Sequence, residues 1–188
     1  MNVEVKDERT TLAAPGERAA TEARATTNVS LVIVRDVRLL LVAIWLGAAV
    51  GFSFAVAPSA FAVLPTHELA GNLVTRTLGI VNVAGFIISL LLLASAFIGR
   101  SMTSRRAWLL EVVSLAVVAL TTFVGHWIIN ARLLALRHSL GRPIDEAAVN
   151  DPVRVAFNSL HGYSVATLGF GMLAGALALL LIARRRVK

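Results

Sequence analysis

The chain contains no cysteine and few charged residues. Of its 188 residues, only 15% are charged and 57% are hydrophobic, and the mean hydropathy is +0.77. The absence of cysteine excludes disulfides, thiolate metal sites, iron–sulfur clusters and cysteine nucleophiles, so a metal ion would need nitrogen or oxygen ligands. The share of charged residues is too low for a soluble domain of this length. The composition therefore predicts a protein embedded in a lipid bilayer.

Acidic residues are also scarce, with 11 Asp and Glu against 18 Lys and Arg. An excess of positive charge can indicate nucleic-acid binding, but these basic residues lie at the ends of apolar runs and form no stripe with interleaved aromatic residues. We therefore expect the lipid bilayer as a partner and no nucleic acid. The sequence shows no nucleophile with a base, no paired carboxylates and no phosphate loop, so we do not expect an enzyme. A homo-oligomer and a small ligand are both left open.

The apolar residues form four runs after a polar segment. Residues 1–30 mix both signs of charge with Ala, Thr and Pro and lack apolar periodicity, so we expect a disordered tail there. Residues 31–188 then form the membrane domain. Each run approaches the ~20 residues that cross a ~30 Å hydrocarbon core. The expected spans are about 39–57, 78–98, 107–129 and 160–183. The predicted fold class is all-α, a polytopic membrane protein with a bundle of four transmembrane helices.

The third and fourth helices are predicted to extend beyond their spans as a long outer hairpin. No stop signal lies between Asn130 and Gly141, and Asp151 with Pro152 is typical of a helix start. Lys and Arg near the spans are more numerous on the side of the two termini than on the hairpin side. The positive-inside rule then predicts a multi-pass protein of the cell membrane with both termini in the cytoplasm.

Two sets of residues carry a family resemblance that covers about residues 37–183. The first set is Trp45, Leu46, Gly47, Phe52, Phe54, Ala57, Pro58, Phe61, Leu64, Pro65, Ala70 and Gly71. The second set is Asn130, Arg132, Leu133, Leu136, Arg137, Asp151, Pro152, Phe157, Leu160, His161, Ser164 and Val165. Their order and spacing resemble the transmembrane protein 205-like family, a four-span family described as domain of unknown function 4149. The chain departs from the family pattern over residues 72–79 and at Ala131. The resemblance implies the fold and the membrane location, and it implies no particular activity.

Polar residues in the third and fourth helices form a candidate site near the hairpin. Counting inward from the hairpin at ~1.5 Å per residue places Asn130 and His161 at one level, with His126 one turn deeper beside Ser164. An unpaired amide or imidazole is costly in hydrocarbon, so we expect an Asn130–His161 hydrogen bond with Arg132 or Tyr163 nearby. On this interpretation the cluster fixes helix register and no cofactor is needed.

The alternative is that His126, His161 or both bind haem or copper, since ionisable groups within a membrane tend to be functional. The layout of four spans with histidines near one membrane face is distantly similar to copper-resistance and haem-handling membrane proteins. A likeness of layout does not transfer function. Two histidines are also an incomplete metal site.

Small residues indicate where the helices are expected to approach closely. Gly47 and Gly51 form a small-x-x-x-small pair in the first span. Gly171 and Gly175 share one face of the fourth span with His161. We expect both glycine pairs to pack against other helices of the bundle.

Glu111 is the one acidic residue within an expected span. It lies about 6 Å inside the cytoplasmic end of the third helix. We therefore expect it to pair with Arg105 or Arg106. A proton-relay role is the alternative, although no second acidic group lies in a span.

Overall fold

The computed structural model describes residues 15–98, 100 and 103–185, with side chains at Thr26 and from Val29 onward. The described part is built from helices and contains no strand, which confirms the all-α fold class. Four helical stretches in it are long and apolar enough to cross a membrane. They are Val29–Val63, His67–Ser95, Arg105–Leu140 and Pro152–Ala183.

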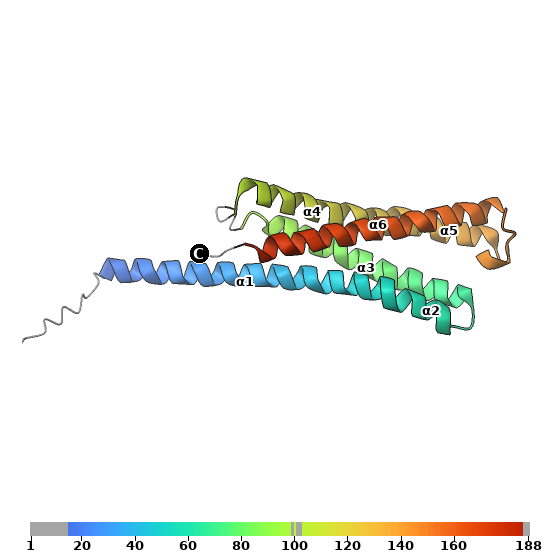
Figure 1. The fold of residues 1–188 in the computed structure, drawn as a ribbon, viewed down its shortest axis with the longest axis horizontal. Coiled ribbons are helices and arrows are strands. Elements are labelled where there is room, and N and C mark those ends of the chain that lie inside the picture. The colour runs from blue at the N-terminus through green and yellow to red at the C-terminus, as the bar shows by residue number, and fades with distance from the viewer. Residues whose placement is uncertain (1–14, 99, 101–102, 186–188) are drawn as a thin grey trace, which may run out of the picture.

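The four stretches lie side by side along the long axis of the molecule (Figure 1). The elements in chain order are α1 (Pro15–Gly51), the π-helix η1 (Phe52–Val56), α2 (Ala57–Val63), α3 (His67–Ser95), α4 (Arg105–Phe123), the π-helix η3 (Val124–Asn130), α5 (Ala131–Leu140), the 3-10 helix η4 (Ile144–Glu146) and α6 (Pro152–Ala183). We call the end of the bundle where α6 finishes the terminal end. The opposite end, which holds η4 and the α2–α3 connection, is the hairpin end (Figure 1).

A side-chain cap and a backbone cap fix where α6 begins and where α5 ends. The Asp151 carboxylate accepts a hydrogen bond from the Val153 backbone N–H at 2.8 Å, and Pro152 occupies the first turn of α6. Gly141 follows α5 with φ of 64°, a left-handed conformation that glycine adopts without a steric cost. These caps confirm the predicted start of the fourth helix and the end of the third. The third helix therefore reaches well beyond its expected span, as far as Leu140.

The N-terminal segment differs from the sequence prediction. We expect a disordered tail over residues 1–30, whereas α1 begins at Pro15. Residues 15–30 are rich in Ala, Glu and Arg, which have high helix propensity, and they continue a helix that the membrane span already nucleates. Residues 1–14 lie outside the described residues.

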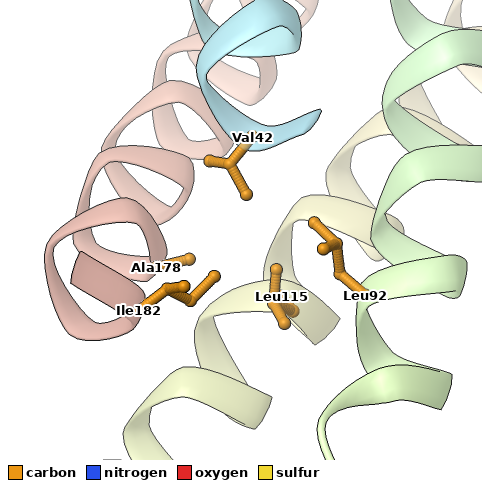
Figure 2. Close-up of a cluster of buried hydrophobic side chains, with 5 residues drawn as sticks. All are labelled: Val42, Leu92, Leu115, Ala178 and Ile182. Atoms are coloured by element: carbon orange, nitrogen blue, oxygen red, sulfur yellow. The ribbon is translucent and has the colours of Figure 1, made fainter. Parts of the chain in front are cut away.

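A cluster of buried apolar side chains joins all four stretches (Figure 2). Val42 from α1, Leu92 from α3 and Leu115 from α4 meet Ala178 and Ile182 from α6. Each of the five side chains is at most 2% exposed. Because the helices meet around one set of side chains, the described stretches form a single bundle.

Trp45 fills the next layer of the bundle with the help of glycines. Its indole Nε1 donates a hydrogen bond to the Val81 carbonyl at 3.1 Å. A Cβ atom added at Gly85 would lie 2.7 Å from Trp45 Cε2, and one added at Gly175 would lie 2.7 Å from Trp45 Cζ3. At Gly171 an added Cβ would lie 2.8 Å from Thr121 Oγ1. The structure thus shows close helix contacts at Gly171 and Gly175, as expected.

The packing predicted for Gly47 and Gly51 is wrong for this bundle. An added Cβ at either glycine would meet nothing within 4 Å. The buried face of α1 is occupied instead by Trp45 and Ala49, which repeat at helical spacing. Gly47 is two residues from Trp45 and therefore points about 200° away around the helix.

We predict that Gly175→Leu lowers the stability of the protein in detergent much more than Gly162→Leu. A leucine at position 175 would collide with the Trp45 ring, whereas nothing lies within 4 Å of a Cβ at Gly162. Overpacking a core of this kind costs about 1–3 kcal/mol. Thermal unfolding of the two purified variants measures the difference, and equal losses would remove the evidence for a tight Trp45 pocket.

Candidate functional site

A buried carboxylate bound by two arginines lies at the terminal end. Arg38 Nη2 lies 2.7 Å from Glu111 Oε1, and Arg185 Nη2 lies 2.7 Å from Glu111 Oε2. Glu111 is 0% exposed and Arg38 is 3% exposed. We call these three residues the Arg–Glu–Arg triad. The triad connects α1, α4 and the residues that follow α6.

The expected pairing of Glu111 with Arg105 or Arg106 is wrong. Those arginines precede Glu111 by six and five residues on α4, and residues at such spacings do not face each other on a helix. Both side chains are exposed. The partners of Glu111 are Arg38 of α1 and Arg185, which follows α6.

The triad also contacts the end of α3. Arg38 Nη2 donates to the Leu92 carbonyl at 3.1 Å, and Arg38 Nη1 donates to the Ser95 carbonyl at 3.5 Å. The last carbonyls of a helix have no partner within the helix, and they attract positive charge. The arginines therefore neutralise Glu111 and complete the C-terminal end of α3 at the same time.

A cavity of about 680 Å³ occupies the hairpin end, between α3, α5, the connection before α6 and α6 itself. We call it the hairpin-end cavity. Polar side chains supply much of its wall. They include His67, Glu68, Asn72, Thr75, Asn130, Arg137, His138, Arg142, Asp145, Asn158, His161 and Ser164. The cavity thus gathers three of the predicted site residues, which are Asn130, His161 and Ser164.

Arg137 reaches across this cavity. Its Nη1 donates to Asn72 Oδ1 at 3.0 Å, and its guanidinium carbon lies 5.3 Å from the centre of the Phe157 ring. A Cβ added at Gly71 would lie 2.7 Å from Arg137 Nη2, so the glycine makes room for the guanidinium. Within the described part of the chain Arg137 forms no ion pair, although Glu68 lines the same cavity.

A second hollow of about 650 Å³ lies between α3 and the η3–α5 stretch. We call it the lateral groove. His126 and Asn130 form part of its wall, and His126 lies against Gly79, where an added Cβ would be 3.6 Å from His126 Nδ1. This Nδ1 atom is buried and has no hydrogen-bond partner among the described residues. The wall of the groove therefore includes a histidine with one buried ring nitrogen whose hydrogen-bonding capacity is unused.

The structure does not show the predicted Asn130–His161 hydrogen bond. Both residues line the hairpin-end cavity, but no hydrogen bond joins them in the part of the chain that the structure describes. His161 stacks on Phe157 with ring centres 6.5 Å apart. Asn130 lies at the end of η3, whose wider turn changes the phase of the helix and places the Asn130 amide 4.0 Å from an added Cβ at Gly79 on α3.

The remaining residues of the predicted site do not gather in one place. Arg132 is exposed and lines neither cavity. Ser164 is buried beside the hairpin-end cavity. His126 lines the lateral groove and His161 lines the hairpin-end cavity, so the two histidines are not brought to one cavity. Among the described residues there is no group of three or more His, Cys, Asp or Glu placed to hold a metal ion.

Sequence reasoning missed Arg38, Arg185 and Arg137. A signal for Arg38 exists, because it precedes Val42 and Trp45 at spacings of four and seven residues and so shares their buried face. A charged residue in phase with a buried stripe indicates an internal ion pair. Arg137 is among the residues that carry the family resemblance, but nothing in the sequence identifies its partners, because these depend on how α5 lies against α3.

A family model described as a domain of unknown function (DUF4149) matches residues 40–141, which is more than half of the chain. The chain belongs to the DUF4149 family. The match includes Trp45, Glu111, Asn130 and Arg137, whereas Arg38 and all of α6 lie outside it. No curated protein and no solved structure matches the chain. The DUF4149 match and the four apolar helices together describe an integral membrane protein.

We predict that Glu111→Gln strongly destabilises this DUF4149 protein. The substitution leaves two buried guanidinium groups without a counter-charge, and removing one partner of a buried ion pair costs about 3–5 kcal/mol. Glu146→Gln is the matched control, because Glu146 is exposed in η4. The stability of both variants is measured as the fraction of denaturing detergent in mixed micelles at which half of the protein unfolds. Equal unfolding midpoints for the two variants would show that the triad contributes little to stability.

Proposed function

We propose that this protein is a non-enzymatic membrane protein that acts by binding at its hairpin-end cavity, with a role in stress resistance or in the assembly of other membrane components. The observation that carries the proposal is the unequal use of polar groups at the two ends of the bundle. At the terminal end the buried charges bind one another. At the hairpin end polar side chains surround a cavity.

The chemistry of the cavity supports binding of a negatively charged group. Arg137 has no carboxylate within 4.0 Å among the described residues, although Glu68 and Asp145 line the same cavity, and its guanidinium is held in place by Asn72 and Phe157. A guanidinium presents several N–H donors in a fixed plane, which suits carboxylates and phosphates. His67 Nδ1 lies 3.0 Å from Asp145 Oδ2, and this contact joins the start of α3 to η4 in the wall of the hairpin-end cavity.

The arrangement of hydroxyl groups supports a non-enzymatic role. From Ser30 onward, the hydroxyls that form hydrogen bonds do so with backbone atoms, as Ser114 does with the Leu110 carbonyl and Thr122 with the Val118 carbonyl. Nucleophilic catalysis needs a hydroxyl bonded to a side-chain base. The observed bonds from hydroxyl groups to backbone carbonyls instead satisfy these hydroxyl groups inside an apolar helix.

We predict that Arg137→Ala abolishes the protective or assembly role, whereas Arg132→Ala preserves it. Arg132 is exposed on the same helix and lines neither cavity, so it is a matched loss of charge. The test compares growth under membrane stress in cells that lack the gene and in cells that carry each variant, with protein levels measured alongside. Full rescue by Arg137→Ala at normal protein level would contradict the proposal.

Haem or copper binding by His126 or His161 is the alternative function. The observation that favours it is the buried His126 Nδ1 atom without a partner. The absorption spectrum and the metal content of the purified protein distinguish the two functions. A haem band or stoichiometric copper that disappears in His126→Ala or His161→Ala would replace the binding proposal.

The proposed orientation places both termini in the cytoplasm and the hairpin end outside the cell membrane. Because the chain has no cysteine, single cysteines report the two sides directly. Val149 is 79% exposed near the hairpin end, and Arg105 is exposed at the terminal end. We predict that an impermeant thiol reagent labels Val149→Cys but not Arg105→Cys in intact cells. The reverse pattern would invert the orientation.

A further inference from the structure

We propose that the lateral groove binds one anionic phospholipid from the bilayer leaflet at the hairpin end. Eight residues of α3 line the groove in a regular helical stripe. They are Asn72, Thr75, Arg76, Gly79, Ile80, Val83, Ala84 and Ile87. The facing wall is His126, Asn130 and Leu134, spaced four residues apart along η3 and α5.

The length and position of the groove match one leaflet. Ser95 ends α3, and the rise over the 19 steps from Arg76 to Ser95 is about 29 Å, close to the ~30 Å hydrocarbon core. Arg76 then lies at the boundary with the headgroups. The groove continues for 11 residues to Ile87, or about 16 Å, which is half of the core. A lipid in one leaflet therefore has the right length to occupy it.

Polarity changes along the groove as it does along a phospholipid. The headgroup end carries Asn72, Thr75 and Arg76, and Arg76 forms no ion pair in the part of the chain that the structure describes. Arginines at this level extend to the interface and attract anionic headgroups. Toward the bilayer centre the wall consists of apolar side chains, including Val83 and Ile87, which suit an acyl chain.

His126 and Asn130 lie between these two regions. Gly79, beside His126, is three residues below Arg76, so this level is about 5 Å inside the headgroup boundary. Phospholipid ester carbonyls occupy this depth and accept hydrogen bonds. The Asn130 amide supplies a donor at this depth, and His126, whose Nδ1 atom is buried against Gly79, forms the wall beside it. The groove thus offers an amide donor where the lipid has acceptors.

Native mass spectrometry of the purified full-length protein tests the proposal. The protein is mixed in neutral detergent with equal amounts of phosphatidylglycerol and phosphatidylcholine that carry identical acyl chains. We expect the wild-type protein to retain one phosphatidylglycerol with a preference of about fivefold, the ratio that one basic residue at a charged surface provides. Equal retention of the two lipids would overturn the proposal.

Two variants with matched controls locate the site. Arg76→Gln removes the charge and should abolish the preference, whereas Arg105→Gln removes an exposed charge at the other end and should preserve it. Ala84→Trp fills the groove and should reduce retention of both lipids, whereas Ala94→Trp lies on α3 outside the groove and should not. An unchanged preference in Arg76→Gln, or displacement of the lipid by a neutral quinone, would contradict a phospholipid site.

Discussion

The contact between the Glu111 carboxylate and two guanidinium groups is the constraint on which the rest of the bundle depends. A carboxylate with no exposed surface is stable only with opposite charge in contact, and α4 itself supplies none. Arg38 and Arg185 must therefore reach the depth of Glu111. This contact fixes the level at which α1 and the residue after α6 lie against α4, and Val42 and Ile182, four and three residues along the chain from the two arginines, lie in the common apolar cluster.

The two ends of the molecule consequently differ in character. At the terminal end, charges and the last carbonyls of α3 satisfy one another across helices. Beyond the Trp45 layer no comparable ion pair closes the bundle within the described residues, and the helices separate around the hairpin-end cavity and the lateral groove. An end closed by buried ion pairs and an end that holds two hollows are the basis of the proposal that the protein binds a partner at its hairpin end.

The sequence predicts the elements well because apolar run length and helix caps are local signals. It also predicts the close contacts at Gly171 and Gly175, which share one face of the fourth span with His161. It does not predict which helix each face meets. The Gly47 pair points away from the bundle, and Glu111 finds partners 73 and 74 residues away. The wider turn of the π-helix η3 rotates Asn130 toward α3. Counting residues at the α-helical spacing of 3.6 per turn does not predict this rotation.

The most direct test of the triad as the organising contact is the coupling between its members. The measurement compares the unfolding free energy of the triple variant Arg38→Met, Glu111→Leu, Arg185→Met with those of the three single variants. Replacing all members of a buried ionic network with apolar side chains is often neutral, whereas removing one strands the others. The triple variant should therefore lose far less stability than the sum of the single losses. A triple loss equal to that sum would show that the three side chains act independently, and it would contradict this account.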